Sequence, residues 1–149
     1  LEGLAAARAA RLASDTDLRV ISEIFTKMEA AHTKARTKDE ARLDAEFHMA
    51  IIEASHNVVM LHMMRSMFQL LREGVFYNRQ VMFRQRTTRS ALLDQHRAIN
   101  DALQARDADG ARAAVEAHLD FVERALADQQ ETARNEKIAR QRLEREQMR

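Results

Sequence analysis

Residues 44–52, DAEFHMAII, decide the fold that this sequence predicts. Their apolar side chains recur at spacings of three and four, which is the period of a helix with one buried face. Asp44 and His48 share this face with Phe47, one helical turn apart. The segment therefore predicts a core helix that carries two metal-capable side chains inward.

The remainder of the chain also favours helix, because it has no proline and only three glycines. Alanine, leucine, arginine and glutamate are abundant, and all four are good helix formers. The predicted fold class is all-α. The chain opens with an apolar helical segment that no capping residue precedes, so we expect that an upstream part has been removed.

Helical periodicity and capping residues predict about six helices. Their expected ranges are residues 1–13, 18–28 after a cap at 14–17, 37–55, 58–71 with Asn57 as cap, 92–103 with Thr88 or Ser90 as cap, and 111–125. A charged tail follows from residue 129, and the path between residues 80 and 88 is not predicted.

Length and composition limit the class of protein. A chain of 149 residues fits one domain, and 46% hydrophobic with 32% charged residues is typical of a globular protein. No apolar run reaches membrane-spanning length and no signal peptide opens the chain, so we expect a cytoplasmic protein without membrane contact. A net charge of +1 provides no field that attracts nucleic acid.

Two further histidines lie on apolar helix faces, His96 and His118, and they join the Asp44 and His48 pair. Burying four such groups without a partner is costly, so their joint pattern predicts one shared mononuclear metal site. The chain has no cysteine, so imidazole and carboxylate must supply every ligand. This set suits a divalent transition metal, with zinc as first choice and nickel, manganese or iron as the other candidates.

The sequence also contains a motif for a second kind of metal site, a di-iron centre. Glu29 with His32, and Glu53 with His56, both read E-x-x-H, a motif that helical di-iron proteins use twice. Both glutamates lie off the apolar faces of their helices, which argues against this site. We expect His32, His56 and His62 to be surface or capping residues.

Four motifs together resemble a known family. They are LEGLAA at residues 1–6, DAEFHMAI at 44–51 followed by His56 and Asn57, HRAI at 96–99, and the segment 114–119 around His118. In this order they are similar to the FCD effector domain of FadR-like regulators in the GntR family. The metal-binding version of that domain has D-x-x-x-H and two later histidines about 22 residues apart, which matches His96 and His118.

The resemblance implies an antiparallel bundle of six or seven helices around a buried divalent metal. It also implies a homodimer and an N-terminal winged helix-turn-helix domain, absent from this chain, through which alone the protein contacts DNA. The FCD-like ligand-binding and dimerisation domain would cover residues 1–127, and residues 128–149 would form a charged helical tail. Within the family, residues 52–62 and the basic tail are most similar to the pyruvate dehydrogenase complex repressor and the lactate-responsive regulators.

The expected effector is a small carboxylate. A 2-oxo or 2-hydroxy acid such as pyruvate or lactate fits a metal with two open positions, because its carboxylate and neighbouring oxygen chelate. Arg65, Arg72 and Arg79 are seven residues apart and are candidates to bind the carboxylate. Asn57 is a further effector-binding candidate. The sequence therefore predicts a sensor rather than an enzyme.

Two alternatives remain open at the level of sequence. A helical-bundle metalloenzyme of the hydrolase type would use the same ligands, although no further general base lies at a recognisable spacing. A metal-free structural dimerisation module would use the histidines as core residues. Metal content separates this second alternative from the sensor.

Overall fold

A computed structural model describes the backbone of residues 1–149 and the side chains of residues 1–69 and 82–149. Over this described chain it consists of α-helices joined by short turns, which confirms the predicted all-α class. The helices are α1 (Glu2–Leu12), α2 (Asp15–Thr33), α3 (Thr37–Ala54), α4 (Val58–Met82), α5 (Arg86–Gln104) and α6 (Ala108–Gln147).

The chain divides into two compact units, Leu1–His118 and Leu119–Arg149. The first turns of α6, up to His118, belong to the first unit. The second unit is helical, and its residues 130–149 are all exposed. Taken over the residues whose side chains are described, none of the helices has the length and apolar character needed to cross a membrane.

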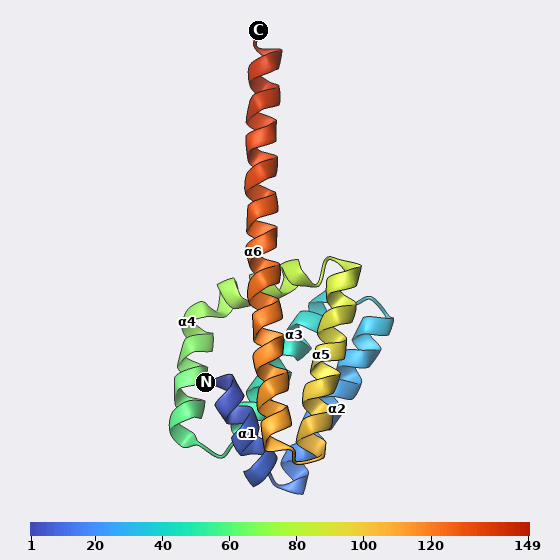
Figure 1. Ribbon diagram of the computed structural model, residues 1–149, viewed down its shortest axis with the longest axis vertical. Coiled ribbons are helices and arrows are strands. Elements are labelled where there is room, and N and C mark those ends of the chain that lie inside the picture. Colours follow the sequence, from blue (N-terminus) through green and yellow to red (C-terminus); the bar gives the residue numbers. More distant parts are fainter. The chain divides into compact units, whose positions relative to one another are not determined.

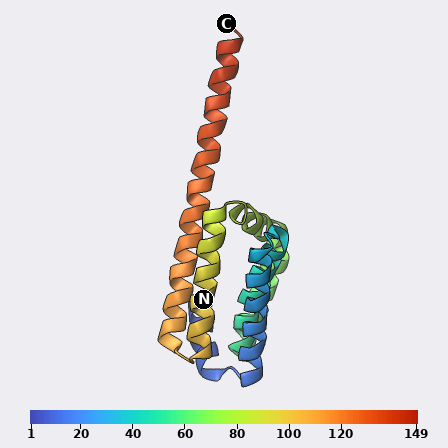
Figure 2. The same ribbon diagram turned by 90° about the vertical axis from the view of Figure 1, so that its right-hand side faces the viewer.

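Within the first unit the helices form two sides with a core between them. Figures 1 and 2 show α2 and α3 on one side and α5 with the first turns of α6 on the other. The short helix α1 contacts both α3 and α5. Its buried residues are glycine and alanines, so its backbone lies close to its neighbours.

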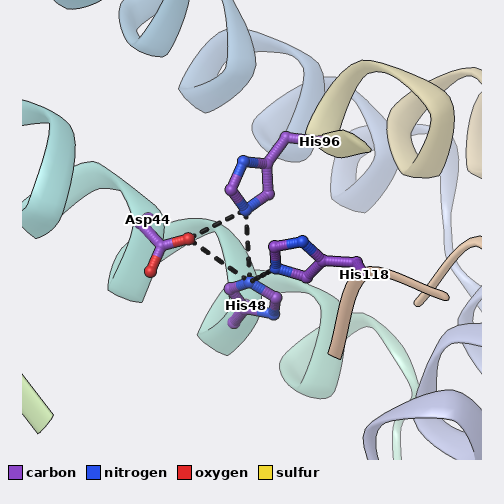
Figure 3. A group of neighbouring side chains, drawn as sticks. All are labelled: Asp44, His48, His96 and His118. Carbon is purple, nitrogen blue, oxygen red and sulfur yellow. Dashed lines mark hydrogen bonds and ion pairs between the residues drawn. The ribbon is translucent and has the colours of Figure 1, made fainter. Parts of the chain in front are cut away.

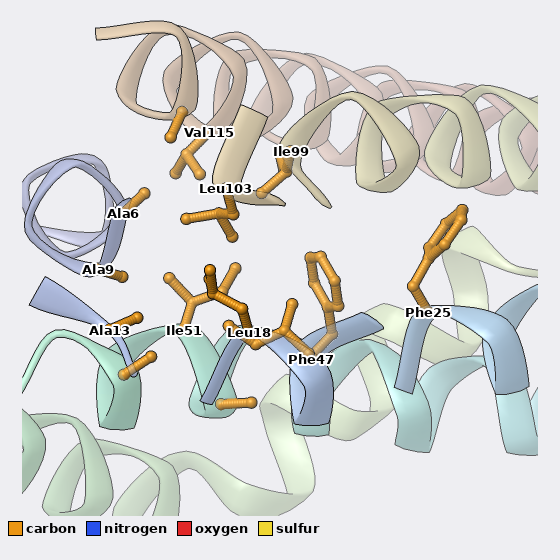
Figure 4. Packing of buried hydrophobic residues seen from close by; sticks show 14 of the residues in the cluster. Ala6, Ala9, Ala13, Leu18, Phe25, Phe47, Ile51, Ile99, Leu103 and Val115 are labelled. Carbon is orange, nitrogen blue, oxygen red and sulfur yellow. The ribbon is translucent and has the colours of Figure 1, made fainter. Parts of the chain in front are cut away.

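The core is formed by apolar side chains from both sides of the unit (Figure 4). Phe47 and Ile51 of α3 lie opposite Ile99 and Leu103 of α5, and Val115 closes the core from α6. Phe47, Ile99 and Leu103 are fully buried. The period read from residues 44–52 thus identifies the buried face of α3 correctly, and this face also fixes where Asp44 and His48 lie.

Two of the predicted helix caps are confirmed. Ser14 and Asp17 form a reciprocal capping box at the start of α2. The Asn57 side chain accepts a hydrogen bond of 3.0 Å from the backbone N–H of Met60 at the start of α4.

The predicted start of α5 at Thr88 or Ser90 is wrong. The helix begins at Arg86, after Gln85, whose side chain makes no capping hydrogen bond. The first turn includes Arg89, and its guanidinium binds the Glu40 carboxylate and the backbone oxygen of His32. These long-range contacts of Arg89 stabilise the first turn of α5, which local capping residues do not predict.

Candidate metal centre

Four metal-capable side chains meet inside the first unit (Figure 3). Asp44 and His48 come from one face of α3, His96 comes from α5, and His118 comes from α6. All four are buried, with exposed fractions between 0% and 5%. The structure therefore brings together the four residues that the sequence singled out.

The ligand atoms of these residues converge. The Asp44 Oδ1 atom lies 2.8 Å from Nε2 of His96 and 3.4 Å from Nε2 of His48. The Nε2 atom of His48 lies 3.3 Å from Nε2 of His96 and 3.2 Å from Nε2 of His118. One ligand atom from each residue lies within 4.8 Å of all the others.

These distances fit a single transition-metal ion. Zinc binds imidazole nitrogen and carboxylate oxygen at about 2.0–2.2 Å, which places neighbouring ligand atoms about 3.0–3.5 Å apart. The donor set, three imidazoles and one carboxylate, also matches the preference of zinc and of its neighbours in the first transition row. The residues present therefore fit the metal that the sequence predicts, and would hold it with Asp44 Oδ1 and three Nε2 atoms.

The electrostatics of the cluster centre on His48. Burial lowers the pKa of His48, but the negative charges of Glu2 and Asp44, with their hydrogen bonds to the ring, outweigh burial and raise that pKa to about 10. Without a metal the ring is therefore an imidazolium at neutral pH. The same negative charges would attract a metal cation in place of this proton.

Two residues that the sequence did not identify complete the site. Glu2 of α1 places Oε2 3.2 Å from Nδ1 of His48. Gln95 of α5 places Oε1 2.7 Å from Nδ1 of His118. Glu2 lies within the LEGLAA motif, but no spacing in the chain connects it to His48. Gln95 gives no signal beyond its position next to His96.

The residues predicted to bind an effector are not members of the cluster, as far as their side chains are described. Asn57 uses its side-chain oxygen to cap α4. Arg65 is 57% exposed and contacts Glu53 at 3.4 Å. Arg72 and Arg79 lie outside the residues whose side chains the structure describes. A role for these residues in effector binding stays a prediction.

The alternative di-iron motif does not assemble in the part of the chain with described side chains. Glu29 and Glu53 are about half exposed and contact Arg97 and Arg65. The remaining histidines also have separate surroundings. His32 contacts Glu40, His56 contacts Asp17, and His62 is exposed.

A small cavity lies beside the cluster. It is lined by His96 and Glu40 together with the apolar side chains of Met28, Phe83 and Leu93. Glu40 is 4% exposed and forms a buried ion pair of 2.7 Å with Arg89. The cavity therefore joins His96 to a fixed ion pair between α3 and α5.

Several regulators are similar to this chain. A protein of Escherichia coli (strain K12), named as a regulatory protein of the L-lactate dehydrogenase operon, is 44% identical over 101 residues, which are 67% of this chain and 39% of that protein. The Glc operon transcriptional activator of the same organism is 31% identical over 131 residues, 86% of this chain and 52% of that protein. The HTH-type transcriptional regulator LutR of Bacillus subtilis (strain 168) is 30% identical over 123 residues, 82% of this chain and 55% of that protein.

The chain thus spans between 39% and 55% of the length of these relatives. Among solved structures, E. coli McbR/YncC has the same fold, with a TM-score of 0.72 and 20% identity over 86% of this chain and 63% of that one. Residues 1–121 match the FCD domain family. The chain therefore belongs to the FCD domain family of GntR-type transcription regulators.

Proposed function

We propose that this chain is the effector-sensing domain of a transcription regulator, and that it binds one divalent transition metal and a small 2-oxo or 2-hydroxy acid. The observation that carries the proposal is the convergence of four buried ligand atoms from α3, α5 and α6. Three imidazoles and a carboxylate form a donor set that suits a divalent transition metal. The regulators similar to this chain support a sensor rather than an enzyme.

The donor set and the name of one relative support the proposed class of acid. A six-coordinate metal held by four protein atoms has two further positions, which would take the carboxylate and the neighbouring oxygen of such an acid in exchange for water. L-Lactate, which appears in the name of one relative, is a 2-hydroxy acid. In this chain the four ligand side chains are buried, so little bulk water reaches the cluster.

Elemental mass spectrometry of the purified chain tests the metal. We expect about one equivalent of transition metal in the wild type, and its loss in His48→Ala and His118→Ala. His62→Ala, which changes an exposed histidine, is the matched control and should keep the metal. Wild-type protein that takes up no metal after resupply would leave the metal-free dimerisation module as the better description.

Isothermal titration calorimetry of the metal-loaded chain tests the effector. L-Lactate and pyruvate should bind to the wild type with a measurable heat and should not bind to His48→Ala. Acetate, which has a carboxylate but no neighbouring oxygen, is the control ligand. Equal binding of acetate and lactate would contradict chelation. Turnover of esters or phosphoesters by the metal-loaded chain would instead favour the alternative of a metalloenzyme.

The full-length regulator would act through a further domain. We propose that it is a cytoplasmic homodimer that binds DNA through an N-terminal winged helix-turn-helix domain, and that effector binding favours one arrangement of the dimer. Measuring operator affinity of the full-length protein with and without L-lactate tests this. No change with any acid of this class would contradict it.

A further inference from the structure

Each of two ligand histidines has a side-chain oxygen beside the ring nitrogen that faces away from the cluster. In His48 this nitrogen, Nδ1, lies 3.2 Å from Oε2 of Glu2. In His118 it lies 2.7 Å from Oε1 of Gln95. The two acceptors come from α1 and α5, so neither belongs to the helix that carries its histidine.

The acceptors determine where each ring carries its proton. A carboxylate oxygen and an amide oxygen only accept hydrogen bonds, so each pairs with an Nδ1–H. A neutral ring with hydrogen on Nδ1 has its lone pair on Nε2. The Nε2 atoms of His48 and His118 are the atoms that converge with Asp44 Oδ1, 3.2 Å from one another.

We propose that Glu2 and Gln95 are positioning residues of the metal site, which accept the Nδ1–H of His48 and His118 and thereby direct both Nε2 lone pairs at the metal. The inference rests on the proposed metal-binding function. It adds two residues and a fourth helix, α1, to a site whose ligands come from α3, α5 and α6.

The two positioning residues differ in charge. Glu2 and His48 meet among the apolar side chains of Ile51, Ile52 and Val115, where little water screens the contact. With Asp44, Glu2 brings two negative charges to the site, which equal the charge of a divalent ion. Gln95 is neutral and contributes orientation alone. Removing the charge of Glu2 should therefore matter beyond the loss of its hydrogen bond.

Zinc affinity, measured by competition with a chromophoric chelator, provides the first test. Glu2→Leu and Gln95→Leu each remove an acceptor and should weaken zinc binding about 10- to 100-fold. Gln95→Glu keeps an acceptor oxygen and should retain or exceed wild-type affinity. Glu2→Gln keeps the oxygen but not the charge, so its affinity should lie between the wild type and Glu2→Leu.

Matched controls separate positioning from general destabilisation. Gln104→Leu removes another partly buried amide of α5, which donates a hydrogen bond to the backbone oxygen of Leu18. Glu46→Gln removes an exposed charge from α3 that contacts Arg42. Both controls should bind zinc with wild-type affinity. Circular dichroism establishes whether each variant is folded. If Glu2→Leu does not fold, the comparison of Gln95→Leu with Gln95→Glu provides the test.

Long-range ¹H–¹⁵N correlation spectra of the imidazole rings provide a readout that a merely structural role would not change. We expect His118 to carry hydrogen on Nδ1 in the metal-free and the zinc-loaded wild type, and Gln95→Leu to change this pattern for His118 alone. Wild-type affinity in both leucine variants, or an Nε2–H tautomer of His118 in the wild type, overturns this inference only. A wild type that binds no zinc overturns the proposed function and this inference with it.

Discussion

His48 lies between two carboxylates in a buried site, and this position determines how the site responds to pH. Its Nε2 faces Asp44 at 3.4 Å and its Nδ1 faces Glu2 at 3.2 Å. Burial lowers the pKa of the ring, but these two partners raise it to about 10, above the ordinary value of 6.5. The stabilisation that protonated His48 gives the metal-free fold is therefore complete below pH 6.5 and is lost as pH rises towards 10.

Metal binding should show the opposite dependence on pH. A metal replaces the proton on Nε2 of His48, so apparent zinc affinity should rise with pH, about tenfold per unit for one displaced proton, until the pH approaches the pKa of about 10. Calorimetric titrations between pH 6.5 and 8.5, in buffers of different ionisation enthalpy, measure both the affinity and the protons released. Zinc affinity that does not change with pH would contradict the protonated state of His48.

The buried ion pair between Glu40 and Arg89 should be costly to break. Arg89→Met leaves the Glu40 carboxylate buried without its guanidinium partner, which should lower the free energy of unfolding by about 3 kcal/mol in urea titrations. Adding Glu40→Gln removes the stranded charge and should recover part of the loss. In contrast, Arg19→Met breaks the exposed pair with Glu23 and should cost less than about 0.5 kcal/mol.

At the scale of helices, three of the connections contain a residue with a left-handed backbone conformation. The first residues after α2, α3 and α5 include Ala35, His56 and Arg106, with φ of 53°, 52° and 54°. Left-handed φ disfavours every side chain, and helix ends usually place glycine there. The backbone N–H groups of Arg36 and Asp107 then bond to carbonyl oxygens five residues earlier, on Ala31 and Ala102.

Ala35→Gly should relieve this strain. Ala35 is exposed, so its methyl group contributes little packing, and the substitution should raise the free energy of unfolding by about 0.5–1 kcal/mol. Ala30→Gly, at an exposed position within α2, is the matched control and should lower it by about the same amount. Urea denaturation of both variants measures the two signs, and a loss of stability in both would contradict the argument.

What the sequence predicts about each helix depends on how local the cause is. Ser14 and Asn57 were predictable as caps, because a capping side chain bonds to a backbone only three residues away. The start of α5 was not, because Arg89 is held by Glu40 from a different helix. Glu2 was missed for the same reason, since 46 positions separate it from His48 and no period connects them.

At the scale of the first unit, the candidate site connects three helices. Asp44 and His48 lie on α3, His96 on α5 and His118 on α6, where His118 is the last residue of the unit. Helical period predicted each inward face separately. That the four residues share one site was predicted from their joint pattern and not from the period of any single helix. In the structure these faces meet around a common core that includes Phe47, Ile99 and Val115.

A metal that bridges three helices should stabilise the whole unit. Any ligand that binds only the folded state raises stability with its concentration, by about 2.7 kcal/mol at one hundred times its dissociation constant, or about 5–10 °C in melting temperature for a chain of this size. Thermal unfolding with zinc and with a chelator measures the shift. His118→Ala keeps the helices but removes the ligand from α6, so zinc should no longer shift its melting temperature, whereas His62→Ala should respond as the wild type does.

The distribution of this stabilisation distinguishes a metal in the core from one on the surface. Zinc held by His118 ties the first turns of α6 to α3 and α5, so amide hydrogens of residues 108–118 should exchange more slowly when zinc is bound. Residues 130–149 are exposed and lie in the second unit, and their exchange should not change. Equal protection of both segments would place the ion outside the cluster, because no ligand of the cluster lies beyond His118.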